Sequence, residues 1–109
     1  MNHNGKRKRR HHKEIMGMYD QFRQKFPAAV REEIVTEGIY YTLARVMATV
    51  NEGFIVGEGL SRRSGGNGIV DGQNSELAKE IALGRAHTAC AIKLAYHKPW
   101  VKLKNLLMA

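Results

Sequence analysis

The stretch NSELAKEIALGRAHTACAIKLAY, residues 74–96, constrains the fold more than any other part of the chain. It contains no proline and is almost uniformly apolar, and a helical wheel places nine of its residues within one arc about 120° wide. That arc holds Leu77, Ala78, Ile81, Arg85, Thr88, Ala89, Ile92, Ala95 and Tyr96. We therefore expect one long helix, capped at Asn74 or Ser75 and ending near Tyr96.

Arg85 is the exception in this arc, because it lies near the middle of the apolar face. A guanidinium stays charged in a protein, so a buried arginine must meet an anion. One interpretation is structural: an ion pair with Glu58 or Asp71, or extension of the side chain past small neighbours. The other is functional, with small residues at Ala82, Gly84, Ala86 and Ala89 letting a phosphate or a flat base approach the guanidinium.

The preceding segment SRRSGGNGIVDGQ, residues 61–73, is rich in glycine and predicts a loop. Successive backbone N–H groups in such turns can bind an anion, as can the amino end of the following helix. The predicted ligand-binding residues are Arg85, Arg62, Arg63, Ser64, Asp71 and Asn74. The segment is not a P-loop, because no Lys-Ser or Lys-Thr pair follows the glycines, and GEGLSR lacks the third glycine of a dinucleotide fingerprint.

The amino-terminal half predicts two helices. From Glu14 to Phe26 the apolar residues recur every three or four positions, at Ile15, Met18, Tyr19, Phe22 and Phe26. Pro27 ends this helix or starts the next. The segment AAVREEIVTEG, residues 28–38, then places Val30, Ile34 and Val35 at helical spacing before Gly38, which predicts a second, shorter helix.

A β-hairpin is expected next. Residues 40–50 are rich in β-branched and aromatic side chains, Asn51 to Gly53 form a turn signal, and FIVGEGLS follows as a second strand. One long helix over residues 28–50 is the competing interpretation. Residues 99–109 suit a short closing strand, or an arm packed on another subunit. The fold class is therefore α+β, with a single domain over residues 14–109.

Positive charge is concentrated at the amino terminus. The 109-residue chain has 18 lysines and arginines against 10 acidic residues, and residues 1–13 predict a disordered basic tail. The expected partners are therefore anionic. The tail either docks on phosphates or only solubilises the protein. Candidate nucleic-acid contacts are Lys6, Arg7, Lys8, Arg9, Arg10 and Arg45, with Arg62, Arg63, Lys102 and Lys104 adding charge and Tyr40 and Tyr41 as stacking faces.

Few residues suggest catalysis. Cys90 is the only cysteine, which excludes an internal disulfide and favours a reducing cytoplasmic location. His87 is the one candidate base for it, and we expect a core cysteine beside a surface histidine. We expect no enzyme, no metal, no cofactor and no membrane association. Leu83 and Leu94 fall on the polar side of the last helix and predict a homo-oligomer.

The second half of the chain resembles a group of small phage-encoded proteins. Their pattern runs from a strand ending in a VG.A.C segment, through a loop with an aspartate, to a helix carrying IALGRA. Residues 81–86 match that motif fully, and Asp71 has the matching position fourteen residues before Arg85. The resemblance covers residues 54–90. It departs at Ser61, Gln73 and Ala78, and nine extra residues, RRSGGNGIV, lengthen the loop.

Some of that group look like Thoeris anti-defence proteins, which sequester cyclic ADP-ribose-type signals or cyclic oligonucleotides without degrading them. The resemblance implies that Asp71 shapes the loop and that Arg85 meets phosphate. The resulting hypothesis is a non-enzymatic, cytoplasmic phage sponge for a phosphate-bearing nucleotide signal. The alternative is a small basic RNA- or DNA-binding accessory protein, and the two differ in whether binding needs the basic tail.

Overall fold

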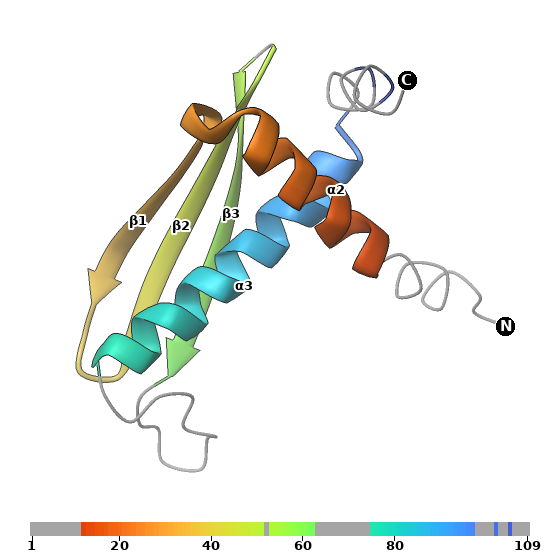
Figure 1. Cartoon of the computed structure of the whole chain (residues 1–109). Coiled ribbons are helices and arrows are strands. Elements are labelled where there is room, and N and C mark those ends of the chain that lie inside the picture. Colours follow the sequence, from red (N-terminus) through yellow and green to blue (C-terminus); the bar gives the residue numbers. More distant parts are fainter. Residues whose placement is uncertain (1–11, 52, 63–74, 98–101, 103–104, 106–109) are drawn as a thin grey trace, which may run out of the picture.

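The computed structural model describes residues 12–51, 53–62, 75–97, 102 and 105. Its fold is α+β, a three-stranded antiparallel sheet of order β1-β2-β3 with two helices on one of its faces (Figure 1). The elements are α2 (His12–Lys25), the 3-10 turn η1 (Pro27–Ala29), β1 (Val30–Glu37), β2 (Tyr41–Val50), β3 (Gly53–Arg62) and α3 (Ser75–Ala95).

The first helix confirms its prediction. Helix α2 buries Ile15, Tyr19 and Phe22, which recur every three or four residues on one side. The helix ends at Lys25, and Pro27 opens η1 because proline lacks the N–H that a continuing helix needs. The apolar stripe thus fixes which side of α2 faces the core.

The second predicted helix is wrong, because residues 30–37 form strand β1. Val30 and Ile34 are four apart, a spacing that fits one face of a helix and one face of a strand equally well. Pairing with β2 decides between them, with Val30 opposite Ala48 and Ile34 opposite Ala44. The register shifts between Ile34 and Thr36, so Val35 is an extra residue that bends this edge strand.

The predicted hairpin is confirmed, and the competing long helix is wrong. Strands β2 and β3 pair antiparallel from Val50 opposite Gly53 to Tyr41 opposite Arg62. Gly53 has a φ of 143°, a conformation that side-chain-bearing residues rarely adopt. The glycine in NEG therefore lets the chain reverse tightly into β3.

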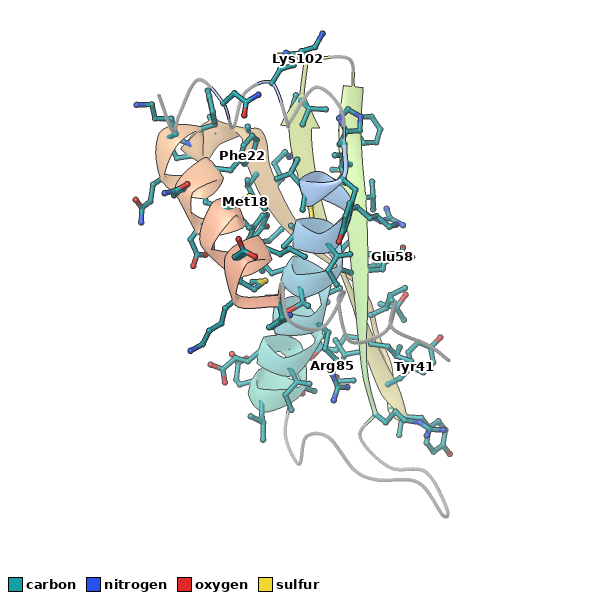
Figure 2. All side chains as sticks on the ribbon, turned by 90° about the vertical axis from the view of Figure 1, so that its right-hand side faces the viewer. Met18, Phe22, Tyr41, Glu58, Arg85 and Lys102 are labelled. Atoms are coloured by element: carbon teal, nitrogen blue, oxygen red, sulfur yellow. The ribbon has the colours of Figure 1, made fainter. Side chains whose placement is uncertain are left out.

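Alternation along the strands gives the sheet two different faces. The even-numbered residues of β2 from Thr42 to Val50 are all buried against the helices. Figure 2 shows both helices on the same side of the strands. We call the opposite side the uncovered face. It carries Tyr41, Leu43, Arg45 and Met47 of β2 and Phe54, Val56, Glu58 and Leu60 of β3, each of them exposed or half-buried.

The last helix has the predicted extent but buries a different face. Helix α3 runs from Ser75 to Ala95, and its buried residues are Ala78, Ala82, Ala86, Cys90, Ala91 and Leu94. Leu77, Ile92 and Tyr96 of the predicted arc are 39%, 42% and 64% exposed. The wheel predicts a core face that includes Leu77, Ile81 and Ile92, whereas the buried residues of α3 are alanines and Cys90, with Leu94 near the carboxyl end.

Glycines in β3 explain why α3 buries such small residues. A Cβ atom built on Gly57 would lie 2.2 Å from the backbone nitrogen of Cys90, and one on Gly59 would lie 2.2 Å from the carbonyl oxygen of Ala82. Two backbones touch here without side chains between them. Only residues as small as alanine and cysteine fit on the facing side of α3, and Ser61 Oγ donates a 2.8 Å hydrogen bond to the Ala78 carbonyl along the same contact.

Several predicted segments fall outside the described residues. These include residues 1–11 of the basic tail and most of residues 99–109. Lys102 and Asn105, which the structure does describe, have helical backbone rather than the predicted strand. No helix among the described residues is long and apolar enough to cross a membrane.

Candidate nucleic-acid interface

Arg85 lies at the surface beside β3, not in the core. Its guanidinium donates a 2.7 Å hydrogen bond to the main-chain carbonyl of Leu60. Figure 2 places it between α3 and the strands. Glu58, one predicted partner, bonds Arg45 instead at 3.2 Å. The prediction of a central, buried arginine is therefore wrong. Arg85 is exposed, and it extends from the side of α3 next to the buried alanines to the edge of the sheet.

The proposed reason for the small residues around Arg85 is also corrected. Ala82 and Ala86 have no exposed surface, and their backbones contact Gly59. They are small because two backbones approach each other there, which leaves no room for a base or a phosphate. Gly84 is exposed and has no heavy atom within 4 Å of an added Cβ.

Lys93 repeats the contact that Arg85 makes. Its ammonium donates a 2.9 Å hydrogen bond to the Val56 carbonyl, four residues from Leu60 on the same strand. Because β3 is an edge strand, such carbonyls would otherwise lack a partner in the sheet. Arg85 and Lys93 form what we call the cationic edge, with contact points about 13 Å apart along the strand.

Sequence reasoning missed Lys93, although a signal existed. Arg85, Ala89 and Lys93 are spaced by four residues and form the row next to the buried row of alanines on α3. Among the residues that the structure describes, no carboxylate is paired with Lys93. Its charge is therefore available at the rim of the sheet.

A shallow cleft adjoins Lys93 on the uncovered face. It has a volume of about 530 Å³ and is lined by Arg45, Met47, Phe54, Val56, Glu58 and Lys93. Phe54 is 66% exposed, while Met47 and Val56 are half-buried. The cleft therefore combines an aromatic face, an aliphatic floor and two cationic side chains, and we call it the Phe54 cleft.

Arg45, predicted as a nucleic-acid contact, lies in the Phe54 cleft between two carboxylates. Its guanidinium is 3.2 Å from Glu58 and 3.6 Å from Glu33 on the opposite strand. These ion pairs hold the guanidinium in place across three strands, and they also neutralise much of its charge. Arg45 is thus better placed to form directed hydrogen bonds than to attract phosphate over a distance.

The other predicted site residues divide into two groups. Arg62 is exposed at the end of β3, two residues beyond the carbonyl that Arg85 contacts, and Tyr40 and Tyr41 are 64% and 44% exposed. The structure therefore brings Arg62 and Arg85 to the same end of β3. Outside the described residues lie Arg63, Ser64, Asp71, Asn74, Lys6, Arg7, Lys8, Arg9, Arg10 and Lys104.

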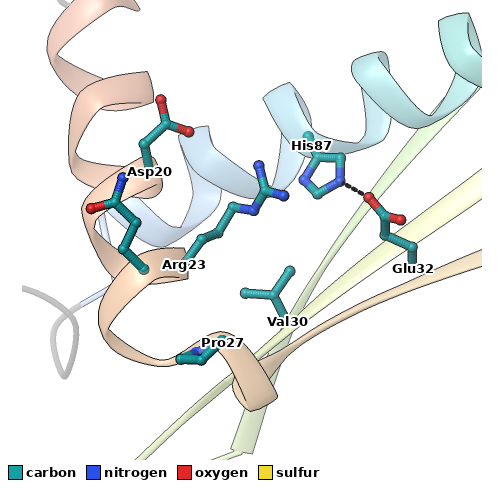
Figure 3. Close-up of a pocket in the computed structure, with 7 residues that line it drawn as sticks. Asp20, Arg23, Pro27, Val30, Glu32 and His87 are labelled. Carbon is teal, nitrogen blue, oxygen red and sulfur yellow. Dashed lines mark hydrogen bonds and ion pairs between the residues drawn. The ribbon is translucent and has the colours of Figure 1, made fainter.

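A second cleft lies on the helical side of the molecule (Figure 3). Its volume is about 560 Å³, and its lining is Asp20, Arg23, Gln24, Pro27, Val30, Glu32 and His87. His87 joins three elements here. The hydroxyl of Tyr19 donates to Nδ1 at 2.6 Å, and Nε2–H donates to the Glu32 carboxylate at 2.5 Å. Burial raises the pKa of Tyr19, so its phenol keeps the proton that it donates.

These contacts decide the roles of His87 and Cys90. The His87 side chain is only 12% exposed and both ring nitrogens have partners, so the prediction of a surface histidine is wrong. Cys90 is fully buried, its thiol donates to the Ile55 carbonyl, and burial raises the pKa of that thiol to about 11. The prediction of a core cysteine is confirmed, since a reactive thiol needs a lowered pKa.

The leucines predicted at a subunit interface lie inside the monomer. Leu94 is fully buried, and Leu83 is half-buried and packs against the core. The basis given for a homo-oligomer is therefore wrong, and the oligomeric state stays a prediction. Among the described residues, no group of three or more histidine, cysteine, aspartate or glutamate side chains could hold a metal ion.

Comparison with known proteins gave no relative: no family model, curated protein or solved structure matches this chain.

Proposed function

We propose that this protein binds nucleic acid by holding its phosphate backbone along the cationic edge. The observation that carries this proposal is the pair of bonds from Arg85 and Lys93 to carbonyls of one edge strand. Anchoring of this kind restricts two long side chains before any ligand arrives, which lowers the entropy lost on binding. A row of fixed cations suits a polyanion with regularly spaced charges.

The basic tail adds charge to the same task. The predicted tail, residues 1–13, is shorter than expected, because His12 and Lys13 belong to α2. Residues 1–11 hold five of the chain's 18 lysines and arginines. Each phosphate that a lysine or arginine neutralises releases counterions, so binding of this kind weakens steeply as salt is added. The tail supplies attraction, and the cationic edge supplies fixed contacts.

The direct test is fluorescence anisotropy with a labelled 20-nucleotide single strand and a 20-base-pair duplex, from 50 to 300 mM NaCl. Replacing Arg85 and Lys93 together by alanine should weaken binding at least tenfold. It should also reduce the slope of log K against log salt by about 1.4 to 1.8, the effect of two lost phosphate contacts.

Lys79→Ala is the matched control. Lys79 lies on the same helix, but its ammonium is within 3.7 Å of Glu37 and 3.6 Å of Glu76, so its charge is already balanced. Its loss should change the affinity less than twofold. Equal affinity of the wild type and the Arg85/Lys93 double variant at every salt concentration would overturn the proposal, as would absence of binding at 50 mM.

A phage sponge for a small phosphate-bearing signal is the second candidate. It is favoured by one observation, that Arg85 contacts the strand two residues from Arg62 at the start of the predicted loop. Native mass spectrometry and melting with cyclic ADP-ribose isomers and cyclic dinucleotides test it. A ligand at 100 times its Kd should stabilise the fold by about 2.7 kcal/mol, and Arg85→Ala should abolish that shift. No mass shift and no melting shift would reject it.

A further inference from the structure

The Phe54 cleft adds a feature that phosphate binding alone does not explain. Phe54 is 66% exposed next to the β2–β3 turn, and it stands over a floor formed by Met47 and Val56. An aromatic ring that is two-thirds exposed buries only part of its apolar surface on folding, and it offers a flat face to a ligand. The chemistry of this face therefore bears on what kind of nucleic acid binds.

We infer that the Phe54 cleft receives an unpaired nucleobase, so that the nucleic acid bound is single-stranded RNA or DNA. This inference rests on the proposed function. Bases in a duplex are stacked on one another and show only their edges in the grooves, whereas an unpaired base has a face free to stack on an aromatic ring. An exposed aromatic ring on a sheet thus discriminates between the two forms.

The polar rim of the cleft matches the rest of a nucleotide. Lys93 belongs both to the cleft lining and to the cationic edge, so a phosphate on Lys93 would leave its base within the cleft. Arg45 and Glu58, bonded to each other at 3.2 Å, provide a donor group and an acceptor group for the edge of that base. Aromatic face, base-edge partners and phosphate contact occur together in one cleft.

Charge argues for this occupant over a second copy of the chain. Arg45 and Glu58 in the cleft lining balance each other, which leaves the Lys93 ammonium as the uncompensated charge of that lining. The whole chain carries a net charge of +8, so a polyanion is attracted where another copy is repelled. A dimer through the uncovered face is nevertheless a distinct outcome of the test. It would bury Phe54 and leave no room for a base.

The test compares Phe54→Ala with two matched variants. Phe54→Trp keeps an aromatic face, and Leu60→Ala removes a 46% exposed apolar side chain from the same face and strand but outside the cleft lining. Anisotropy is measured with oligo-dT, oligo-rU and the 20-base-pair duplex. Light scattering reports the mass of each variant, and circular dichroism reports its folding.

The wild type should prefer both single strands over the duplex. Phe54→Ala should weaken single-strand binding about tenfold while duplex binding stays unchanged, since stacking on one ring is lost. Phe54→Trp should restore the affinity, and Leu60→Ala should change it less than twofold. Exposed positions of this kind leave the core intact, so all three variants should melt like the wild type.

Three results would overturn the inference. Equal binding of single strands and duplex, unaffected by Phe54→Ala, would reject the base site while leaving the proposed function standing. Failure of the wild type to bind any of the three probes would reject both. A wild-type dimer that Phe54→Ala converts to monomer, with unchanged nucleic-acid affinity, would assign the uncovered face to self-association.

Discussion

Gly57 and Gly59 set the distance between α3 and the sheet. At both positions an added Cβ would fall 2.2 Å from backbone atoms of the helix, closer than any van der Waals contact. Neither backbone can yield at one point without moving the whole element. The position of Arg85 at the sheet edge therefore depends on residues that carry no side chain at all.

Gly59→Ala should destabilise the fold by about 3 kcal/mol, the upper end of the range for overpacking, because the helix must move away from the sheet to admit the methyl group. Gly84→Ala is the control on the exposed side of α3, where nothing lies within 4 Å. It should stabilise the protein by about 0.5 to 1 kcal/mol through helix propensity. Urea denaturation followed by circular dichroism measures both, and similar effects of the two changes would contradict the close contact.

Cys90 predicts a loss of stability in alkaline solution. Burial raises the pKa of its thiol to about 11, whereas in the unfolded chain it titrates near about 8.5. Between these values the unfolded state has lost a proton that the native state keeps, so the free energy of unfolding falls as pH rises. The loss should be on the order of 2 kcal/mol by pH 11.

Denaturation curves of the wild type and Cys90→Ala, recorded from pH 7.5 to 11, test this. The variant should be less stable at pH 7.5 because of a small cavity, yet its stability should fall less steeply between pH 8.5 and 10. Tyr19, whose pKa burial also raises, adds a fall in both proteins above pH 10. Parallel curves over the lower range would show that Cys90 is not the group responsible.

Helix α2 is attached to the rest of the fold by polar and apolar contacts together. Ile15 and Phe22 join the core, while Tyr19 bonds His87 on α3, which in turn bonds Glu32 on β1. One imidazole thus connects three elements that are far apart in the sequence. Losing the Tyr19 hydroxyl leaves Nδ1 of a largely buried ring without its donor.

Tyr19→Phe should therefore lower the free energy of unfolding by about 1 to 2 kcal/mol, although it keeps the aromatic ring in place. Tyr96→Phe removes a hydroxyl from a residue that is 64% exposed and should have an effect below about 0.5 kcal/mol. Thermal and urea denaturation compare the two. If both substitutions lower the free energy of unfolding equally, the hydrogen bond from Tyr19 to His87 contributes nothing to the docking of α2.

Local pattern predicted most elements, and its failures have physical causes. Two elements are determined by a few neighbouring residues alone. They are helix α2, with its apolar stripe of Ile15, Tyr19 and Phe22, and the turn at Asn51–Gly53. Strand β1 is not determined in this way, since the spacing of Val30 and Ile34 fits either structure and only pairing with β2 selects the strand. The buried face of α3 depends on Gly57 and Gly59, which lie at least 16 residues before the start of that helix.

The candidate site was less predictable than the fold, for the same reason. Arg85 could be singled out because an arginine among apolar residues is unusual, but its surface position follows from how α3 sits on the sheet. Phe54 lies near the opposite end of β3, and the sequence predicts it only as part of a strand. Its exposure depends on the whole arrangement, in which both helices cover the same face.

At the scale of the molecule, the two faces of the sheet have different roles: one packs against the core, and the other carries the proposed binding site. The core, from Ile15 to Leu94, lies between the helices and the covered face, and the uncovered face carries Phe54 and the polar groups around it. Changes on the uncovered face should therefore alter binding with little change in stability. The basic tail is assigned to the proposed binding function by its composition, because residues 1–11 include five lysines and arginines and no acidic residue.

Deleting residues 1–11 should leave the melting temperature within about 2 °C of the wild type while weakening nucleic-acid binding in a salt-dependent way. Calorimetry and anisotropy on the same sample measure the two effects. A large drop in melting temperature would show that the tail contributes to the fold. Undiminished nucleic-acid affinity would remove the tail from the proposed interface.

The single cysteine, buried where α3 meets β3, also allows the opening rate of this contact to be measured. A thiol reagent can reach Cys90 only when the helix separates from the sheet, so the rate of alkylation measures how often this seam opens. The chain needs no engineered label for such an experiment. A ligand on the uncovered face that slows alkylation would reveal that opening the seam also disturbs the opposite side of the sheet.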